Sequence, residues 1–167
     1  MILPPIIFPV YEKEYTIRLS PDIVRKKISN LTQKGYFILR EVFVPANLKK
    51  PFCGEINDYS FKIFRNVGYA NPFLPIICGQ IFSENGKTKI KLLMRIHYVF
   101  LSFFILIFVL PTVFISFFAL TKTGLLGFLM FFIALIFEYL FVIVPFNIEA
   151  NMSYKILNRA LGLSEDK

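Results

Sequence analysis

The sequence predicts an α+β cytoplasmic domain, an antiparallel β-meander with an N-terminal and a C-terminal helix, interrupted by a two-helix transmembrane hairpin. Three observations predict this class. Two apolar segments of membrane-spanning length, 98–120 and 125–146, lie four residues apart. Short alternating segments and turn residues fill the chain before them. Finally, 56% of the 167 residues are hydrophobic and Phe alone supplies 21, too apolar a composition for a soluble domain of this length.

This pattern divides the chain into a cytoplasmic α+β domain (1–97), a transmembrane hairpin (98–146) and a C-terminal cytoplasmic helix and tail (147–167). Each apolar segment is about as long as the roughly 20-residue helix that crosses a bilayer core. Only Thr121-Lys122-Thr123-Gly124 separates them, so we expect the two helices to run antiparallel.

The N-terminal residues MILPPIIFPV are apolar but do not form a signal peptide, because they lack a basic region and a cleavage site, and three prolines break a helix. We expect an extended arm that covers the sheet or lies at the membrane face. Residues 14–19 alternate like a strand. Ser20 as N-cap and Pro21 at the first helical position then predict a helix that ends at Gly35, and 36–44 look extended.

From Pro51 onward the sequence predicts a meander of short strands. Asn85-Gly86 is typical of a type I′ hairpin turn, and Asn57-Asp58 predicts a second turn. Asn71-Pro72 and Pro75 flank the start of the strand segment 73–82, which indicates an edge position or a bulge there.

The last strand segment before the hairpin, 87–97, has one basic and one apolar face. Thr88, Ile90, Leu92, Met94 and Ile96 form the apolar face, and Lys87, Lys89, Lys91, Arg95 and His97 form the basic one, interrupted by Leu93. The favoured interpretation is a solvated strand face that also acts as a topology signal. The alternative is that Lys87, Lys89, Lys91 and Arg95 contact lipid headgroups, where each cation contributes about 1 kcal/mol.

Charge sets the predicted orientation. Residues 1–96 carry fifteen of the nineteen Lys and Arg residues, while the hairpin loop carries only Lys122. The positive-inside rule therefore places both termini in the cytoplasm. Cys53 and Cys78 would then be reduced, and two Cys and one His at no recognised spacing give no support for a metal site.

Residues 149–163, after the second apolar segment, predict a helix with one apolar stripe: Met152, Ile156, Ala160 and Leu163. The helix either lies on the inner leaflet or docks on the sheet. Docking is favoured because one N-terminal helix is little cover for four or five strands.

The stretch from Pro51 to His97 reads P-F-x-G-x-I…Y-S-F-K-I-x-R-N…Y-x-N-P-F-L-P-I-I-x-G-x-I…N-G-x-T-K-I-K…M-R-I-H and is followed directly by the hairpin. In this it resembles a family of small uncharacterised bacterial two-span membrane proteins, and the resemblance extends to about Phe146. It implies an integral protein of the bacterial inner membrane and supplies no catalytic residue. The order of elements is also similar to helix-grip lipid-binding domains at the level of the fold.

Glu138 is the single carboxylate of the two apolar segments. Such a residue at the centre of a spanning helix costs about 2.5–3.5 kcal/mol. Counting back across the hairpin places Glu138 at the depth of Ile107, whose carbonyl loses its donor to Pro111. We expect a protonated Glu138 to donate to this carbonyl. The alternatives are a partner's helix, proton movement, or snorkelling, and Ser102, Thr112 and Ser116 are expected to bond to their own helix.

No phosphate-binding Gly-rich loop, nucleophile elbow or HExxH motif is present in the sequence, so we expect a non-enzyme without a cofactor. The positive-inside rule accounts for the basic charge without nucleic acid. The favoured function is an accessory or scaffold protein that acts through its hairpin and cytoplasmic domain, with membrane lipids and a membrane-protein partner or a second copy as partners. The alternative is a domain that binds lipid or another apolar ligand at the inner leaflet, and bacteriocin immunity is a third idea from size and class alone.

Overall fold

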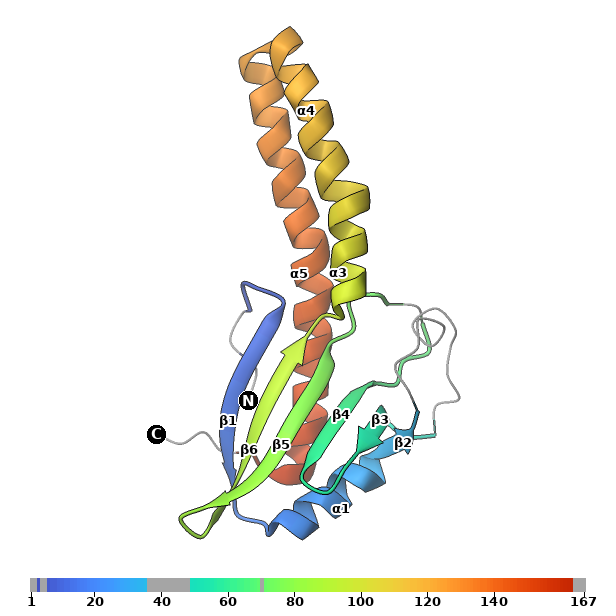
Figure 1. The fold of residues 1–167 in the computed structure, drawn as a ribbon, viewed down its shortest axis with the longest axis vertical. Coiled ribbons are helices and arrows are strands. Elements are labelled where there is room, and N and C mark those ends of the chain that lie inside the picture. The colour runs from blue at the N-terminus through green and yellow to red at the C-terminus, as the bar shows by residue number, and fades with distance from the viewer. Residues whose placement is uncertain (1–2, 4–5, 36–48, 70, 164–167) are drawn as a thin grey trace.

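In the computed structural model of this protein, the described residues are 3, 6–35, 49–69 and 71–163. They form a six-stranded sheet, helix α1 (Pro21–Leu31) beside it, and two long apolar helical segments that leave the sheet together (Figure 1). The predicted α+β class is confirmed. The sheet is mixed, however, because β2 (Thr32–Lys34) runs parallel to β3 (Phe52–Ile56).

The strand order in the sheet is β1-β6-β5-β4-β3-β2. The remaining strands are β1 (Val10–Ile17), β4 (Ser60–Arg65), β5 (Ile76–Glu84) and β6 (Lys87–Arg95). Strands β3 to β6 form an antiparallel meander in chain order. Strand β1 pairs antiparallel with β6, from Val10 opposite Arg95 to Ile17 opposite Thr88. The first strand therefore lies beside the last one, which the local sequence pattern did not indicate.

Both predicted turns are confirmed. Asn85 and Gly86 have φ angles of 51° and 73°, which a type I′ turn requires at its two central positions. They join Glu84 to Lys87, the last pair of the β5–β6 hairpin. At the second turn, the Asn57 N–H donates to the Ser60 carbonyl at 2.8 Å.

Two local predictions about the sheet were wrong. Strand β5 is central, between β4 and β6; Pro72 and Pro75 precede its first residue, so the missing proline N–H groups fall outside the ladder. Helix α1 ends at Leu31 rather than continuing to Gly35, because Thr32 adopts an extended backbone and pairs with β3. The predicted extended segment 36–44 lies outside the described residues.

Three helical segments follow β6 end to end: α3 (Tyr98–Phe104), the π-helical segment η1 (Ile105–Val109) and α4 (Leu110–Thr123). The Leu110 N–H bonds to the Ile105 carbonyl, five residues back. Pro111 has no N–H to continue the α-helical pattern, and the wider π turn lies directly before it.

The chain then reverses at Gly124, whose positive φ of 55° allows the tight turn. The predicted loop 121–124 is thus wrong for residues 121–123, which are helical. Helix α5 (Leu125–Leu161) returns as one 37-residue helix that continues through Pro145. The predicted span 125–146 and the predicted C-terminal helix are therefore parts of one continuous helix.

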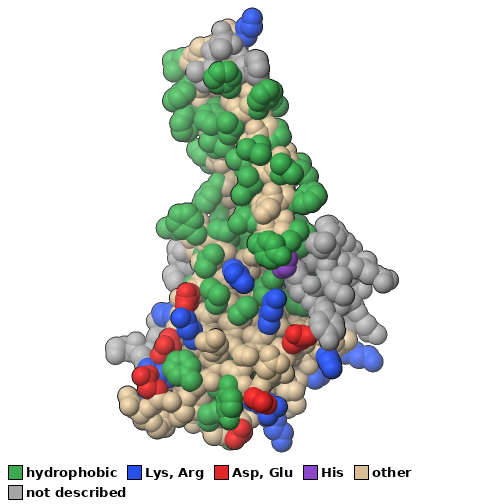
Figure 2. All heavy atoms as spheres, viewed as in Figure 1, with side chains coloured by type: hydrophobic (Ala, Val, Ile, Leu, Met, Phe, Trp, Pro, Cys, Tyr) green, Lys and Arg blue, Asp and Glu red, His purple; other side chains and the backbone are tan. Residues whose placement is uncertain are grey.

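Two helices in the described part of the chain are long and apolar enough to cross a membrane, Tyr98–Phe117 and Leu125–Leu161. Their apolar windows are only 11% and 17% buried, unlike the core helix of a soluble protein. Figure 2 shows hydrophobic side chains over the length of the two helices, while charged side chains gather over the sheet.

The second half of α5 packs against one face of the sheet, its inner face, and forms the core with it. The prediction that the C-terminal helix docks on the sheet is confirmed. Its buried residues follow a helical repeat, in which each lies three or four positions from another: Phe146, Glu149, Ala150, Ser153, Tyr154, Leu157 and Leu161. Fully burying a side chain such as Phe146 or Leu157 contributes about 1.5–3 kcal/mol. Of the predicted stripe, Leu163 is buried in the core and Ile156 and Ala160 pack against it, whereas Met152 is exposed.

Candidate functional site

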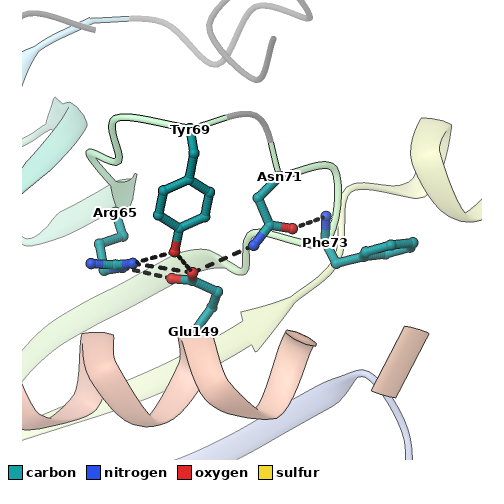
Figure 3. Close-up of polar contacts among 5 residues, drawn as sticks. All are labelled: Arg65, Tyr69, Asn71, Phe73 and Glu149. Carbon is teal, nitrogen blue, oxygen red and sulfur yellow. Dashed lines mark hydrogen bonds and ion pairs between the residues drawn. The ribbon is translucent and has the colours of Figure 1, made fainter. Parts of the chain in front are cut away.

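A buried ion pair joins α5 to the sheet (Figure 3). Glu149, on α5, is 2% exposed. The Arg65 guanidinium at the end of β4 donates to both of its carboxylate oxygens, from Nε at 2.6 Å and from Nη2 at 3.1 Å. The Tyr69 hydroxyl also donates to Glu149, and Asn71 Nδ2 donates at 3.4 Å. One carboxylate thus accepts hydrogen bonds from side chains of a strand and of the loop that follows it.

This cluster, Arg65–Tyr69–Asn71–Glu149, is fixed from both sides. Arg65 Nη2 donates to the Tyr69 hydroxyl at 2.8 Å, and the Asn71 Oδ1 accepts from the Phe73 N–H at 3.0 Å. Burial, and then the hydrogen bond to Glu149, raise the pKa of Tyr69. Burial alone would lower the pKa of Arg65, but the hydrogen bond and charge of Glu149 outweigh it and raise that pKa. The guanidinium therefore remains a cation opposite the carboxylate.

Sequence reasoning missed this cluster. Arg65, Tyr69 and Asn71 all belong to the quoted motif, but their partner Glu149 lies about 80 residues away, beyond the hairpin. The available signal was a single acid at the start of the C-terminal helical pattern, where a carboxylate is also expected for helix-end reasons. Only the antiparallel return of α5 brings the two parts together.

The N-terminal arm runs along α5 and is held by a ladder of amide side chains. Asn151 Oδ1 accepts from the Leu3 N–H at 2.9 Å. Asn147 makes two bonds with Ile6, accepting from its N–H and donating to its carbonyl, both at 2.9 Å. The Tyr139 hydroxyl donates to the Ile7 carbonyl at 2.9 Å. The arm therefore climbs α5 toward the apolar half of the helix.

Two cations of the predicted basic face of β6, Lys89 and Lys91, are paired with acids. Lys89 contacts Glu84 at 2.6 Å and Glu14 at 2.9 Å, and Lys91 contacts Glu12 at 2.7 Å. The hydrogen bond to Glu84, followed by that to Glu14, raises the pKa of Lys89. Because β6 runs toward α3, Arg95 is the cation of this face nearest the apolar helices, and Lys87 is the most distant one.

His97 caps the first apolar helix. Its Nδ1 accepts from the Val99 N–H at 3.2 Å, and its ring stacks on Tyr98 with centroids 4.7 Å apart. Burial, and then the charges of Lys62 and Arg95, lower the pKa of His97. These contacts give it a structural role at the start of α3.

Glu138 contacts Thr112 across the two apolar helices. The Thr112 hydroxyl donates to Glu138 Oε1 at 2.5 Å, so Thr112 does not bond to its own helix as expected. Oε2 is buried and has no partner among the described residues, and the expected bond to the Ile107 carbonyl does not occur there. The reason is geometric: the helices turn at Gly124 rather than over four residues, so Glu138 lies opposite a residue closer to the turn than Ile107.

Glu138 also lines an apolar groove of about 250 Å³ at the base of the two helices. We call it the arm groove. Three walls form it, from the tip of the N-terminal arm, from α3 and η1, and from α5. The lining residues are Ile7, Phe8, Pro9, Leu101, Phe104, Ile105, Val109, Leu135, Glu138, Tyr139, Val142 and Ile143. Its rim is open, since Ile7, Phe8 and Tyr139 are exposed.

Within the described residues, no three His, Cys, Asp or Glu side chains lie close enough to hold a metal ion. Cys53 and Cys78 are not joined by a disulfide bond. Comparison of the chain with protein-family models, with curated proteins and with solved structures returned no match.

Proposed function

We propose that this chain is a two-span integral membrane protein of the bacterial inner membrane, with both termini and the α+β domain in the cytoplasm. We propose further that it is a non-enzymatic accessory or scaffold protein, which holds a membrane-protein partner or a second copy through its hairpin and domain. The exposed apolar surface of the two helices and the excess of Lys and Arg in residues 1–96 support the membrane placement and its direction.

The observation that carries the scaffold proposal is the continuity of α5. Residues of its first half, such as Ile133 and Phe137, are exposed and apolar, whereas Phe146 and Leu157 of its second half lie in the domain core. The Arg65–Glu149 pair and the amide ladder tie the domain to the same helix. A partner bound to the hairpin would therefore be held at a fixed geometry relative to the domain, which suits a scaffold.

Accessibility of single cysteines tests the topology. With Cys53 and Cys78 replaced by Ser, a cysteine is placed either at Lys122 beside the hairpin turn or at Asp58 in the β3–β4 turn, both exposed positions. In intact bacterial cells a membrane-impermeant maleimide should label K122C and leave D58C unlabelled until the membrane is opened. The reverse pattern would invert the proposed orientation. Extraction of the protein by alkaline carbonate would contradict its integral membrane placement.

Native mass spectrometry of the mildly solubilised full-length chain tests the scaffold role. We expect a protein adduct or a homo-oligomer of fixed stoichiometry. Replacing Ile133 and Phe137 by Ala on the exposed face of α5 should dissociate it, while Met152→Ala, outside the apolar half, should not. A monomer under all conditions would contradict the proposal.

The alternative function, binding of lipid or another apolar ligand, is favoured by one observation. The inner face of the sheet is filled by α5, with Phe146, Tyr154 and Leu157 at most 1% exposed, so a helix-grip ligand cavity would have to displace that helix. The arm groove, in contrast, is open and apolar. It is therefore the part of the molecule that fits an apolar ligand.

A further inference from the structure

The tip of the N-terminal arm, residues 6–9, presents large apolar side chains at its surface. Ile7 is 67% exposed and Phe8 is 75% exposed, and no charged residue precedes Glu12 in the sequence. The tip adjoins the exposed apolar part of α5, because Tyr139 of that helix donates a hydrogen bond to the Ile7 carbonyl. Figure 1 shows the turn before β1 near the height at which α3 begins. The arm tip therefore extends the apolar surface of the two helices, and a surface of this kind is typical of membrane contact.

Two hydrogen bonds fix the height of the arm tip relative to a membrane. At 1.5 Å per residue, a hydrocarbon core about 30 Å thick corresponds to about 20 residues of α5 after Gly124 and ends near Val144. On this scale Tyr139 lies about 7–8 Å inside that edge and Asn147 about 4–5 Å outside it. Asn147 bonds to Ile6 and Tyr139 bonds to Ile7. The arm tip is therefore held at the edge of the core.

The backbone of the arm tip meets the condition for an irregular segment at this depth. Within the hydrocarbon region, backbone polar groups need partners from the protein. All four carbonyls of residues 6–9 accept a hydrogen bond, and the donors are the side chains of Asn147 and Tyr139 and the N–H groups of Val10 and Ile96. Pro9 has no N–H, and the Ile6 N–H donates to Asn147. The N–H groups of Ile7 and Phe8 make no bond within the described chain and lie where the polar headgroup region begins.

We propose that the arm tip inserts into the inner leaflet beside the two helices, with the Phe8 side chain among the acyl chains next to the headgroup region. The inference rests on the proposed membrane placement of the hairpin. The tip is then a third, non-spanning membrane contact of the kind that buries apolar side chains about 5–10 Å into the boundary between headgroups and acyl chains. Because β1 follows the tip directly and pairs with β6, this insertion holds the edge of the sheet close to the membrane surface.

The chain contains no tryptophan, so a single introduced Trp reports on its own surroundings without background. Three variants of the full-length protein are reconstituted into phospholipid vesicles: Phe8→Trp at the arm tip, Phe132→Trp on the exposed apolar half of α5, and Ile23→Trp on α1. Ile23 is the matched control, an exposed apolar side chain of the domain on the helix farthest from the hairpin turn (Figure 1). The vesicles contain lipid brominated near either the glycerol end or the methyl end of its acyl chains, because bromine quenches Trp emission on contact.

We expect bromine near the glycerol end to quench F8W more strongly than bromine near the methyl end, since the tip lies at the edge of the core. Phe132 lies about 12 Å from Gly124 along α5, close to the middle of a core about 30 Å thick, so F132W should show the opposite preference. Neither lipid should quench I23W, which should stay accessible to acrylamide present on both sides of the membrane. Adding Ile7→Asp to F8W places a charge at the tip and should lower its quenching by bromine.

The outcomes separate this inference from the membrane placement. If neither lipid quenches F132W, the membrane placement itself fails. If F132W is quenched while F8W behaves like I23W, only the insertion of the arm tip fails. An F8W that is shielded from acrylamide but not quenched by bromine would mean that a protein partner or a second copy covers the tip, which would overturn the proposal. Equal bromine quenching of F8W with and without Ile7→Asp would also overturn it.

Discussion

Replacing Glu149 by Gln removes the charge that holds the domain to α5, while the size of the side chain is retained. The change leaves the Arg65 guanidinium opposite a neutral amide at a site where the carboxylate was 2% exposed. The bidentate bonds from Arg65 at 2.6 and 3.1 Å lose their ionic character, and the Tyr69 and Asn71 donors lose a charged acceptor. We therefore expect a large loss of stability of the α+β domain.

The magnitude follows from burial. Removing one partner of a buried ion pair typically costs about 3–5 kcal/mol, because the other charge remains uncompensated. The Arg65 side chain is still 17% exposed and can partly rehydrate, so the lower end applies. A loss of about 3 kcal/mol in a chain of this size corresponds to a decrease of about 6–12 °C in the unfolding midpoint.

Cys53 is a natural reporter of this unfolding, since it lies buried on β3 beside β4. In a Cys78→Ser background, its labelling by a fluorogenic maleimide is followed during heating of the detergent-solubilised protein. Asp58→Asn is the matched control, because the Arg25–Asp58 pair at 3.1 Å is exposed on both sides and should contribute almost nothing. A midpoint for E149Q no lower than that for D58N would refute the reasoning. Replacing Arg65 by Met together with Glu149 by Leu should recover much of the loss.

Three further predictions concern the arm, the sheet and pH. Asn147→Ala removes both bonds to Ile6 and should raise the rates of hydrogen exchange and proteolysis of the arm. The free energy of unfolding of the domain should fall by no more than about 1–2 kcal/mol. Gly79→Ala would bring a Cβ within 2.0 Å of the Phe61 ring and should destabilise the sheet by about 1–3 kcal/mol, measured by the same thiol assay. Burial, and then the hydrogen bond with Tyr11, raise the pKa of Tyr15 above its ordinary value near 10. The unfolded chain therefore loses this proton at a lower pH than the folded chain does. The contribution of Tyr15 to stability should be constant below about pH 10 and fall as the pH rises further. The prediction is contradicted if, above about pH 10, the unfolding midpoint falls no faster than in a Tyr15→Phe variant.

The local elements of the sheet were largely readable from short-range chemistry. Asn85-Gly86 predicted its turn because positive φ at two consecutive positions strongly selects such residues. The error at β5 came from a displacement of one residue. Pro75 predicted an edge strand, but it lies directly before the first residue of β5, and the ends of elements are uncertain by one or two residues. The length of α1 was misjudged because the pairing of Thr32 with β3 is non-local.

The candidate sites were less predictable, because each depends on segments far apart in the chain. Glu138 was singled out correctly as a carboxylate in an apolar helix, but its partner was not, since the turn at one residue places it opposite Thr112 rather than Ile107. The basic face of β6 was identified, but its acidic partners were not: Glu84 lies on β5, which the predicted turn places beside β6, and Glu12 and Glu14 lie on β1, whose position beside β6 no local pattern reveals.

By itself, the sequence determined the α+β class, two long apolar helices and the turn chemistry, because these depend on composition and on spacings of a few residues. The tertiary structure alone decided that α5 is one helix that belongs to both the hairpin and the domain, and that Glu149 binds Arg65. It also decided that the N-terminal arm lies along α5, bound by its Asn side chains, and forms a groove beside Glu138. These features require segments separated by 80 to 148 residues to meet. Their partners are selected by the packing of the whole chain, in which burial and hydrogen bonding at a distance override local preference.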